Sequence, residues 1–216
     1  GGKGFEYSKL QESFILVRIF KISQNANLKN YIAEYSNSQN AITEIDLKSV
    51  DPLQIQIEDY FRERDVYYSR KAGDIGDVTK EYTFRIPMEK LAQILYSEMG
   101  EPQKASTAKK RLFKDYYSKI FNVENFSMER AFALACKYNE ILSTYKLKHP
   151  DIDYSDQKIF FIVYILSWSK LSIDNAIGKL ESFLDEYVHP DGEISKARKL
   201  LLKGFRDFVD VKLNKQ

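Results

Sequence analysis

The alternation of apolar and polar residues divides the chain into a β-containing first third and a long helical remainder. Residues 14–22 are rich in branched and aromatic side chains and predict a strand. Residues 66–70 and 81–86 are shorter runs of the same kind, and the second alternates clearly. The glycines and aspartates between these two runs are typical of a long hairpin loop. We therefore predict a small sheet early in the chain.

Apolar residues at helical spacing predict helices around these strands. Residues 25–36 form one helix, which ends in a cluster of amides. The next helix begins after Asp51, a good N-cap, with Pro52 at its first position and Gln54 three residues after the cap. A third helix begins at Pro87, whose fixed φ angle suits the first helical position.

From residue 106 onward the pattern predicts helices throughout. Residues 107–121 are basic on one side and aromatic on the other. Residues 194–213 form a final amphipathic helix. Between these segments, three serines stand where N-caps should start helices: Ser127, Ser155 and Ser172.

These elements predict a mainly α fold with a small β part (α+β), that is, a short sheet or hairpin in the first third and a helical bundle in the remainder. Residue 104 is a soft boundary between a mixed α+β part, residues 1–104, and a helical part, residues 105–216. We expect the two parts to pack as one unit. The caps show no repeat period, so a solenoid is not predicted.

Composition adds that any basic surface must be local. The 216 residues are 44% hydrophobic, enough for a real core, and the formal net charge is +2 at pH 7. Residues 1–104 carry 14 Lys and Arg against 16 Asp and Glu, whereas residues 105–216 carry 19 against 15. Positive charge therefore concentrates in the second half.

The cysteine content and the hydropathy of the sequence indicate in which cellular compartment the chain is expected. The single cysteine, Cys136, excludes a disulfide framework within the chain and favours the cytoplasm. The longest apolar run, residues 159–166, is far shorter than the roughly 20 residues of a membrane helix, so no membrane contact is predicted. The chain begins at Gly1 and Gly2 without a methionine, as a fragment with a tag remnant would.

The sequence makes no positive case for catalysis in this chain. It contains neither a phosphate loop, nor a dinucleotide fingerprint, nor a nucleophile elbow. His149 and His189 each precede a proline, with no cysteine or second histidine nearby, which predicts surface turns rather than metal ligands. We therefore predict no cofactor and no metal, and leave open whether a longer protein is an enzyme.

Three basic clusters could bind DNA or RNA, because cations release counterions from a phosphate backbone and tyrosines offer stacking surfaces. Charged runs on helices are more often solvated faces, and the third cluster could instead be a strand that buries one tyrosine. The clusters are Lys104, Lys109, Lys110, Arg111, Lys114 and Lys119 with Tyr116 and Tyr117; Lys196, Arg198, Lys199, Lys203 and Arg206; and Tyr67 and Tyr68 with Arg70 and Lys71.

Several short motifs occur in a fixed order: Tyr35-Ser-Asn-Ser-Gln-Asn-Ala-Ile42, Asp46-Leu47, Asp51-Pro-Leu-Gln54, Phe61 and Tyr67-Tyr-Ser-Arg-Lys-Ala-Gly73. This ordered set resembles the bacterial AIPR family, the abortive-infection phage-resistance proteins. The resemblance covers about residues 14–121 and implies a C-terminal piece of a phage-defence protein, without the upstream nuclease-like domain of many members. The side-chain amides of Asn37, Gln39 and Asn40 could bind adenine or phosphate edges, or they could satisfy the open ends of helices. The family-pattern residues, of unassigned role, are Asn37, Gln39, Asn40, Asp46, Asp51, Gln54, Tyr68, Arg70 and Lys71, and a further segment ends in Tyr117-Ser-Lys-Ile120-Phe121.

Three functions follow as hypotheses. The favoured one is a non-catalytic module of a defence protein that binds or senses nucleic acid. The second is a scaffold that binds a phage protein or a second copy of itself, through an apolar stripe made by Ile194, Leu201, Phe205 and Val209. The third is part of an enzyme whose catalytic domain is missing from this chain. Convergence of the basic clusters on one concave face would favour the first.

Overall fold

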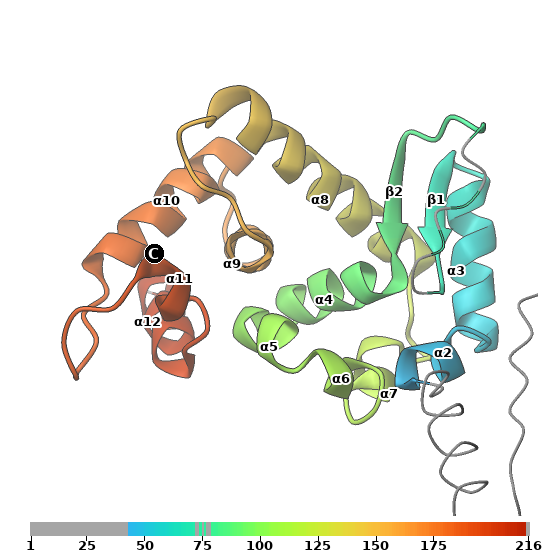
Figure 1. Ribbon diagram of the computed structural model, residues 1–216, viewed down its shortest axis with the longest axis horizontal. Coiled ribbons are helices and arrows are strands. Elements are labelled where there is room, and N and C mark those ends of the chain that lie inside the picture. The colour runs from blue at the N-terminus through green and yellow to red at the C-terminus, as the bar shows by residue number, and fades with distance from the viewer. Residues whose placement is uncertain (1–42, 72–73, 75, 77–78, 215–216) are drawn as a thin grey trace, which may run out of the picture. The chain divides into compact units, whose positions relative to one another are not determined.

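The computed structural model describes residues 43–71, 74, 76 and 79–214, and residues 42–216 form one compact unit. The described part is mainly helical with a small sheet, which confirms the predicted fold class (Figure 1). The expected strand at 14–22, the helix at 25–36 and the amides Asn37, Gln39 and Asn40 lie outside the described residues. The elements are α2 (Glu44–Lys48), α3 (Pro52–Arg62), β1 (Val66–Ser69), β2 (Phe84–Pro87), α4 (Met88–Glu98), α5 (Pro102–Thr107), α6 (Lys109–Leu112), α7 (Tyr117–Ile120), α8 (Met128–Lys148), α9 (Asp156–Ser167), α10 (Ile173–Glu186), α11 (Lys196–Lys199) and α12 (Lys203–Asn214).

The sheet consists of β1 and β2, and its pairing corrects the predicted hairpin. The two strands run parallel, with Val66 opposite Phe84 and Tyr68 opposite Ile86. A tight hairpin turn can join only antiparallel strands, so the segment between them must carry the chain back to the starting end. The hydrophobic pattern missed this because alternation fixes which face of a strand is buried, not its direction. Helix α3 packs beside β1 (Figure 1).

The caps of α2 and α3 follow from their first residues. Thr43 and Asp46 form a reciprocal capping box, in which the Thr43 hydroxyl accepts from the Asp46 N–H at 3.2 Å and the Asp46 carboxylate accepts from the Thr43 N–H at 2.9 Å. Asp51 caps α3, as predicted, by accepting from the Leu53 N–H at 2.9 Å. The expected capping role of Gln54 is wrong, because its side chain is fully buried and bonded elsewhere.

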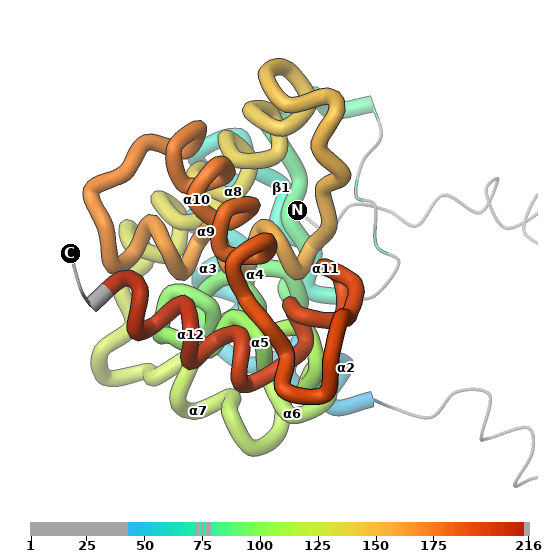
Figure 2. Tube along the Cα trace, turned by 90° about the vertical axis from the view of Figure 1, so that its left-hand side faces the viewer, coloured from blue at the N-terminus to red at the C-terminus, as the bar shows by residue number. Residues whose placement is uncertain are grey.

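Helix α9 is the centre of the helical part and lies between α4 and α10 in both views (Figures 1 and 2). Its apolar residues surround the helix on all sides, and residues 158–165 are all buried. A helix of this kind needs neighbours on every face, and α4, α5, α8 and α10 supply them. The predicted serine caps are confirmed, since Ser127, Ser155 and Ser172 each accept from a backbone N–H of the helix that follows.

Two predicted helices are interrupted. Residues 107–121 contain the short helices α6 and α7 with turns between them, and residues 194–213 contain α11 and α12. The second break changes which leucine is buried. A continuous helix would place Leu201 on the face of Phe205 and Val209, whereas the break buries Leu200 and leaves Leu201 exposed. The expected boundary at residue 104 falls inside α5.

Candidate functional site

An open hollow of about 610 Å³ lies beside α5 and α6, and four of its nine lining residues are cations. We call it the α5–α6 hollow. The chain reaches it through a Schellman turn at the end of α4, where Gly100 adopts a φ of 94° and Pro102 then starts α5. The lining residues are Gln103, Lys104, Ser106, Thr107, Ala108, Lys109, Lys110, Arg111 and Tyr116.

Carboxylates balance three of these four cations. Lys104 pairs with Glu101 at 3.0 Å, Lys109 with Glu89 at 3.1 Å and Arg111 with Asp115 at 2.8 Å. Among the described residues, no carboxylate pairs with the fourth cation, Lys110, or with the nearby Lys114, and both side chains are exposed. The hollow therefore presents one uncompensated charge at its lining and a second close by in sequence.

Arg111 and Tyr116 form an ordered stack at the edge of the hollow. The Tyr116 ring stacks on Tyr96 with centroids 5.0 Å apart, and the Arg111 guanidinium lies over Tyr116 at 4.6 Å. The hydrogen bond to Asp115 raises the pKa of Arg111, and burial raises the pKa of Tyr96 to about 12. Arg111 thus lies as a cation over the Tyr116 ring, next to an exposed carboxylate partner.

Two members of the first cluster belong elsewhere. Lys119 lies over the Tyr96 ring at 5.6 Å and lines a separate hollow with Asn122, Asn125 and Arg130. Tyr117 is buried, and burial raises its pKa. The structure therefore brings Lys104, Lys109, Lys110 and Arg111 together at the hollow, whereas Lys114, Lys119 and Tyr117 do not line it.

The third cluster is largely structural. Tyr68 is 1% exposed and its hydroxyl donates to the Gln54 carbonyl oxygen, so its ring has no face free for a base. Arg70 donates to Glu58 at 2.8 Å and to the Ser49 carbonyl. Lys71 alone is exposed. The alternative of a strand that buries one tyrosine and exposes its charges therefore describes Tyr68 and Lys71, whereas Arg70 is half-buried and paired with Glu58.

Among the family-pattern residues within the described ranges, Asp46, Asp51, Gln54, Tyr68 and Arg70 form hydrogen bonds that support the local fold. The Gln54 amide accepts from Tyr68 and donates to the Tyr117 hydroxyl at 3.1 Å, which ties β1 to α7 through α3. Asp46 and Asp51 cap α2 and α3, and Arg70 fastens the turn between those helices to β1. Buried polar groups need such partners, so these residues have structural explanations.

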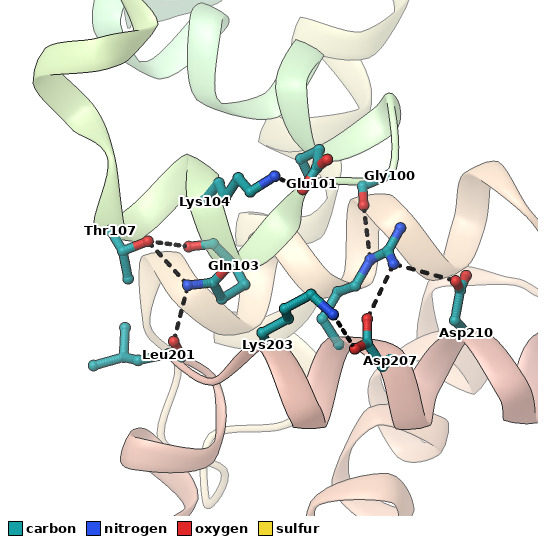
Figure 3. Close-up of polar contacts among 10 residues, drawn as sticks. Gly100, Glu101, Gln103, Lys104, Thr107, Leu201, Lys203, Asp207 and Asp210 are labelled. Atoms are coloured by element: carbon teal, nitrogen blue, oxygen red, sulfur yellow. Dashed lines mark hydrogen bonds and ion pairs between the residues drawn. The ribbon is translucent and has the colours of Figure 1, made fainter.

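The second cluster holds helices together. Lys199 donates to the last carbonyls of α10, those of Leu184 at 2.6 Å and Tyr187 at 2.7 Å. Arg206 donates to the Gly100 carbonyl at 3.1 Å and pairs with Asp207 and Asp210 (Figure 3). In the part of the chain that the structure describes, Arg198 is the member whose side chain has neither an ion pair nor a hydrogen bond.

Figure 3 also shows how α12 meets the outer side of α5. The Gln103 amide donates to the Leu201 carbonyl at 3.0 Å and to the Thr107 hydroxyl at 3.1 Å. Lys203 points to Asp207 and Lys104 to Glu101. The scaffold hypothesis relied on an apolar stripe along this last segment, but Phe205 and Val209 are fully buried.

The sequence predicts the cations of the hollow but not the carboxylates that pair with them. Asp115 stands four residues after Arg111 and Glu101 three before Lys104, so helical spacing could have revealed both pairs. Glu89 lies twenty residues before Lys109, and no local signal predicts that contact.

Neither a metal centre nor a membrane helix is found in the described ranges. No group of three or more His, Cys, Asp or Glu side chains is placed to hold an ion. His149 contacts Asp174 at 3.2 Å, and His189 accepts from the Asp191 N–H in a turn. No helix there combines the length and apolar character needed to cross a bilayer.

Replacing Arg70 by alanine should lower the free energy of unfolding by about 1–3 kcal/mol, because the Ser49 carbonyl and Glu58 lose a charged donor in a half-buried site. Arg62→Ala is the matched control, since its partner Asp59 is exposed, and it should change stability by less than about 0.5 kcal/mol. Urea denaturation measures both. Equal effects would contradict a stabilising role for Arg70.

Comparison with known proteins agrees with the pattern of motifs. The family model described as AIPR protein matches residues 3–197, which is most of the chain. The searches of curated proteins and of solved structures returned no match. The chain belongs to the AIPR family, the abortive-infection phage-resistance proteins.

Proposed function

We propose that this chain is a non-catalytic module through which a phage-defence protein binds or senses nucleic acid, with the α5–α6 hollow as the contact surface. One observation supports this above the others: Lys104, Lys109, Lys110 and Arg111 border one open hollow. The proposed site of action is the cytoplasm, in keeping with the single cysteine and the absence of a disulfide framework.

The paired lysines can still serve a phosphate. The side chains of Lys109 and Glu89 are 56% and 35% exposed, and exposed pairs of this kind contribute only about 0–1 kcal/mol. A phosphate oxygen can therefore replace the carboxylate at little cost. Lys110 has no carboxylate partner among the described residues, so a phosphate oxygen can bind it without replacing one. Binding through such groups releases counterions and weakens as salt concentration rises.

The test is charge reversal at the two unpaired lysines. The double variant Lys110→Glu, Lys114→Glu should bind a fluorescent 30-mer at least about tenfold more weakly at 50 mM salt, with a shallower salt dependence. Fluorescence anisotropy with single- and double-stranded DNA and RNA measures this and identifies the preferred form. Arg198→Glu is the matched control for Lys110→Glu alone, because the two changes alter the net charge equally and Arg198 is also exposed and without an ion pair within the described residues but lies on α11.

Two results would refute the proposal. One is undetectable binding of every nucleic acid by the unmodified chain at low salt. The other is an equal loss of affinity in the Arg198 control, which would mean that net charge alone governs binding. The scaffold alternative receives no support from the stripe on which it relied, since Phe205 and Val209 are inside the core.

A further inference from the structure

The aromatic ring in the α5–α6 hollow already has its stacking partners. Tyr96 stacks on Tyr116 with an interplanar angle of 23°, and Arg111 covers the same ring at 4.6 Å. Tyr96 is 2% exposed and cannot leave the ring, whereas Arg111 is held over the other face by an ion pair with Asp115 that is itself exposed. A nucleic-acid base could stack on Tyr116 only by displacing one of them.

The side chain best suited to reading a base edge is also engaged. An amide can recognise adenine through a pair of hydrogen bonds. The Gln103 Nε2 group, however, donates to both the Thr107 hydroxyl and the Leu201 carbonyl, and the Thr107 hydroxyl donates in turn to the Gln103 backbone carbonyl. The remaining charged groups at the hollow are lysines and one arginine, which bind phosphates as donors.

We infer that the hollow recognises the sugar–phosphate backbone alone, so that its ligand class is a nucleic-acid backbone of any sequence. This rests on the proposed function. Neither stacking nor amide-mediated base contacts contribute, because Tyr96 and Arg111 cover the Tyr116 ring and the Gln103 amide nitrogen already donates within the protein. The hollow would then report the presence of a strand and carry no information about its bases.

The experiment compares an intact 20-mer with an abasic 20-mer of the same backbone by fluorescence anisotropy. Stacking of even one base would make the intact strand bind at least about fivefold tighter. We expect dissociation constants equal within about twofold at each salt concentration, a spread well below that stacking threshold. A fivefold or larger advantage of the intact strand would overturn the inference.

A variant separates ring stacking from support of Arg111. Tyr116→Leu should change the affinity for intact and abasic strands by the same factor, because the ring only positions Arg111. A loss confined to the intact strand would show that the base does use Tyr116, and would also overturn the inference. If neither strand binds at 50 mM salt, it is the proposed function that fails, so the two failures are distinguishable.

Discussion

Replacing Glu181 by alanine should lower the free energy of unfolding by about 3–5 kcal/mol. Lys158 lies on the otherwise apolar α9 and is 8% exposed, and its ammonium forms a close ion pair with the Glu181 carboxylate. Glu181 also pairs with Lys196 at 3.2 Å. Alanine would leave the Lys158 charge buried without a counterion. Removing one partner of a buried ion pair is strongly destabilising for this reason.

Two controls isolate the buried charge. Glu186→Ala removes a carboxylate from the same helix, but this one is exposed and pairs with Lys212, so its effect should be far smaller. Lys158→Met removes the charge itself and should be close to neutral, since an apolar side chain of similar size suits the site. Urea denaturation of all three variants measures the free energies. Equal losses in the two glutamate variants would show that the Lys158 pair adds no stability.

Replacing Gln54 by leucine should have the second-largest effect. The leucine fills a similar volume but leaves the Tyr68 hydroxyl without an acceptor and the Tyr117 hydroxyl without a donor, both in the core. Each orphaned group costs about 1–3 kcal/mol and burial of the apolar leucine offsets part of the sum, so a loss of about 2–4 kcal/mol is expected. Thermal or urea unfolding followed by circular dichroism measures it.

A double-mutant cycle tests the cause. Tyr68→Phe in the Gln54→Leu background removes one orphaned hydroxyl, so the double variant should lose at least about 1 kcal/mol less than the sum of the two single losses. Strict additivity would mean that the two side chains do not act together. In that case the destabilisation by leucine would come from packing alone.

The sequence predicted much of this fold because its strongest signals are local. Asp51 and the serine caps act within three residues, and the all-round apolar character of α9 identifies a core helix. The predictions that were wrong concern contacts between residues that are distant in sequence. Gln54 has the position of a capping residue, yet Tyr68 and Tyr117 recruit it into the core. The strand direction likewise depends on the whole chain.

The candidate site divides in the same way. A run of cations at residues 109–111 is visible in the sequence, as is the tyrosine that follows. Whether a cation is available to bind a ligand depends on its neighbours in space. Arg70 and Arg206 instead donate hydrogen bonds to backbone carbonyls that are distant in sequence. No local pattern distinguishes such an arginine from Lys110, which has no ion pair among the described residues.

The junction between β2 and α4 has no spare length. Pro87 ends the strand and caps the helix, and its neighbours Ile86 and Met88 are both buried. One extra residue here would either turn the strand over or rotate the helix by about 100°, so that buried side chains would no longer face the core. The turn at residues 149–155 between α8 and α9 is mostly exposed and could lengthen into solvent. Evolution and protein engineering can therefore vary the outer turn freely, whereas the join between sheet and bundle has a fixed length.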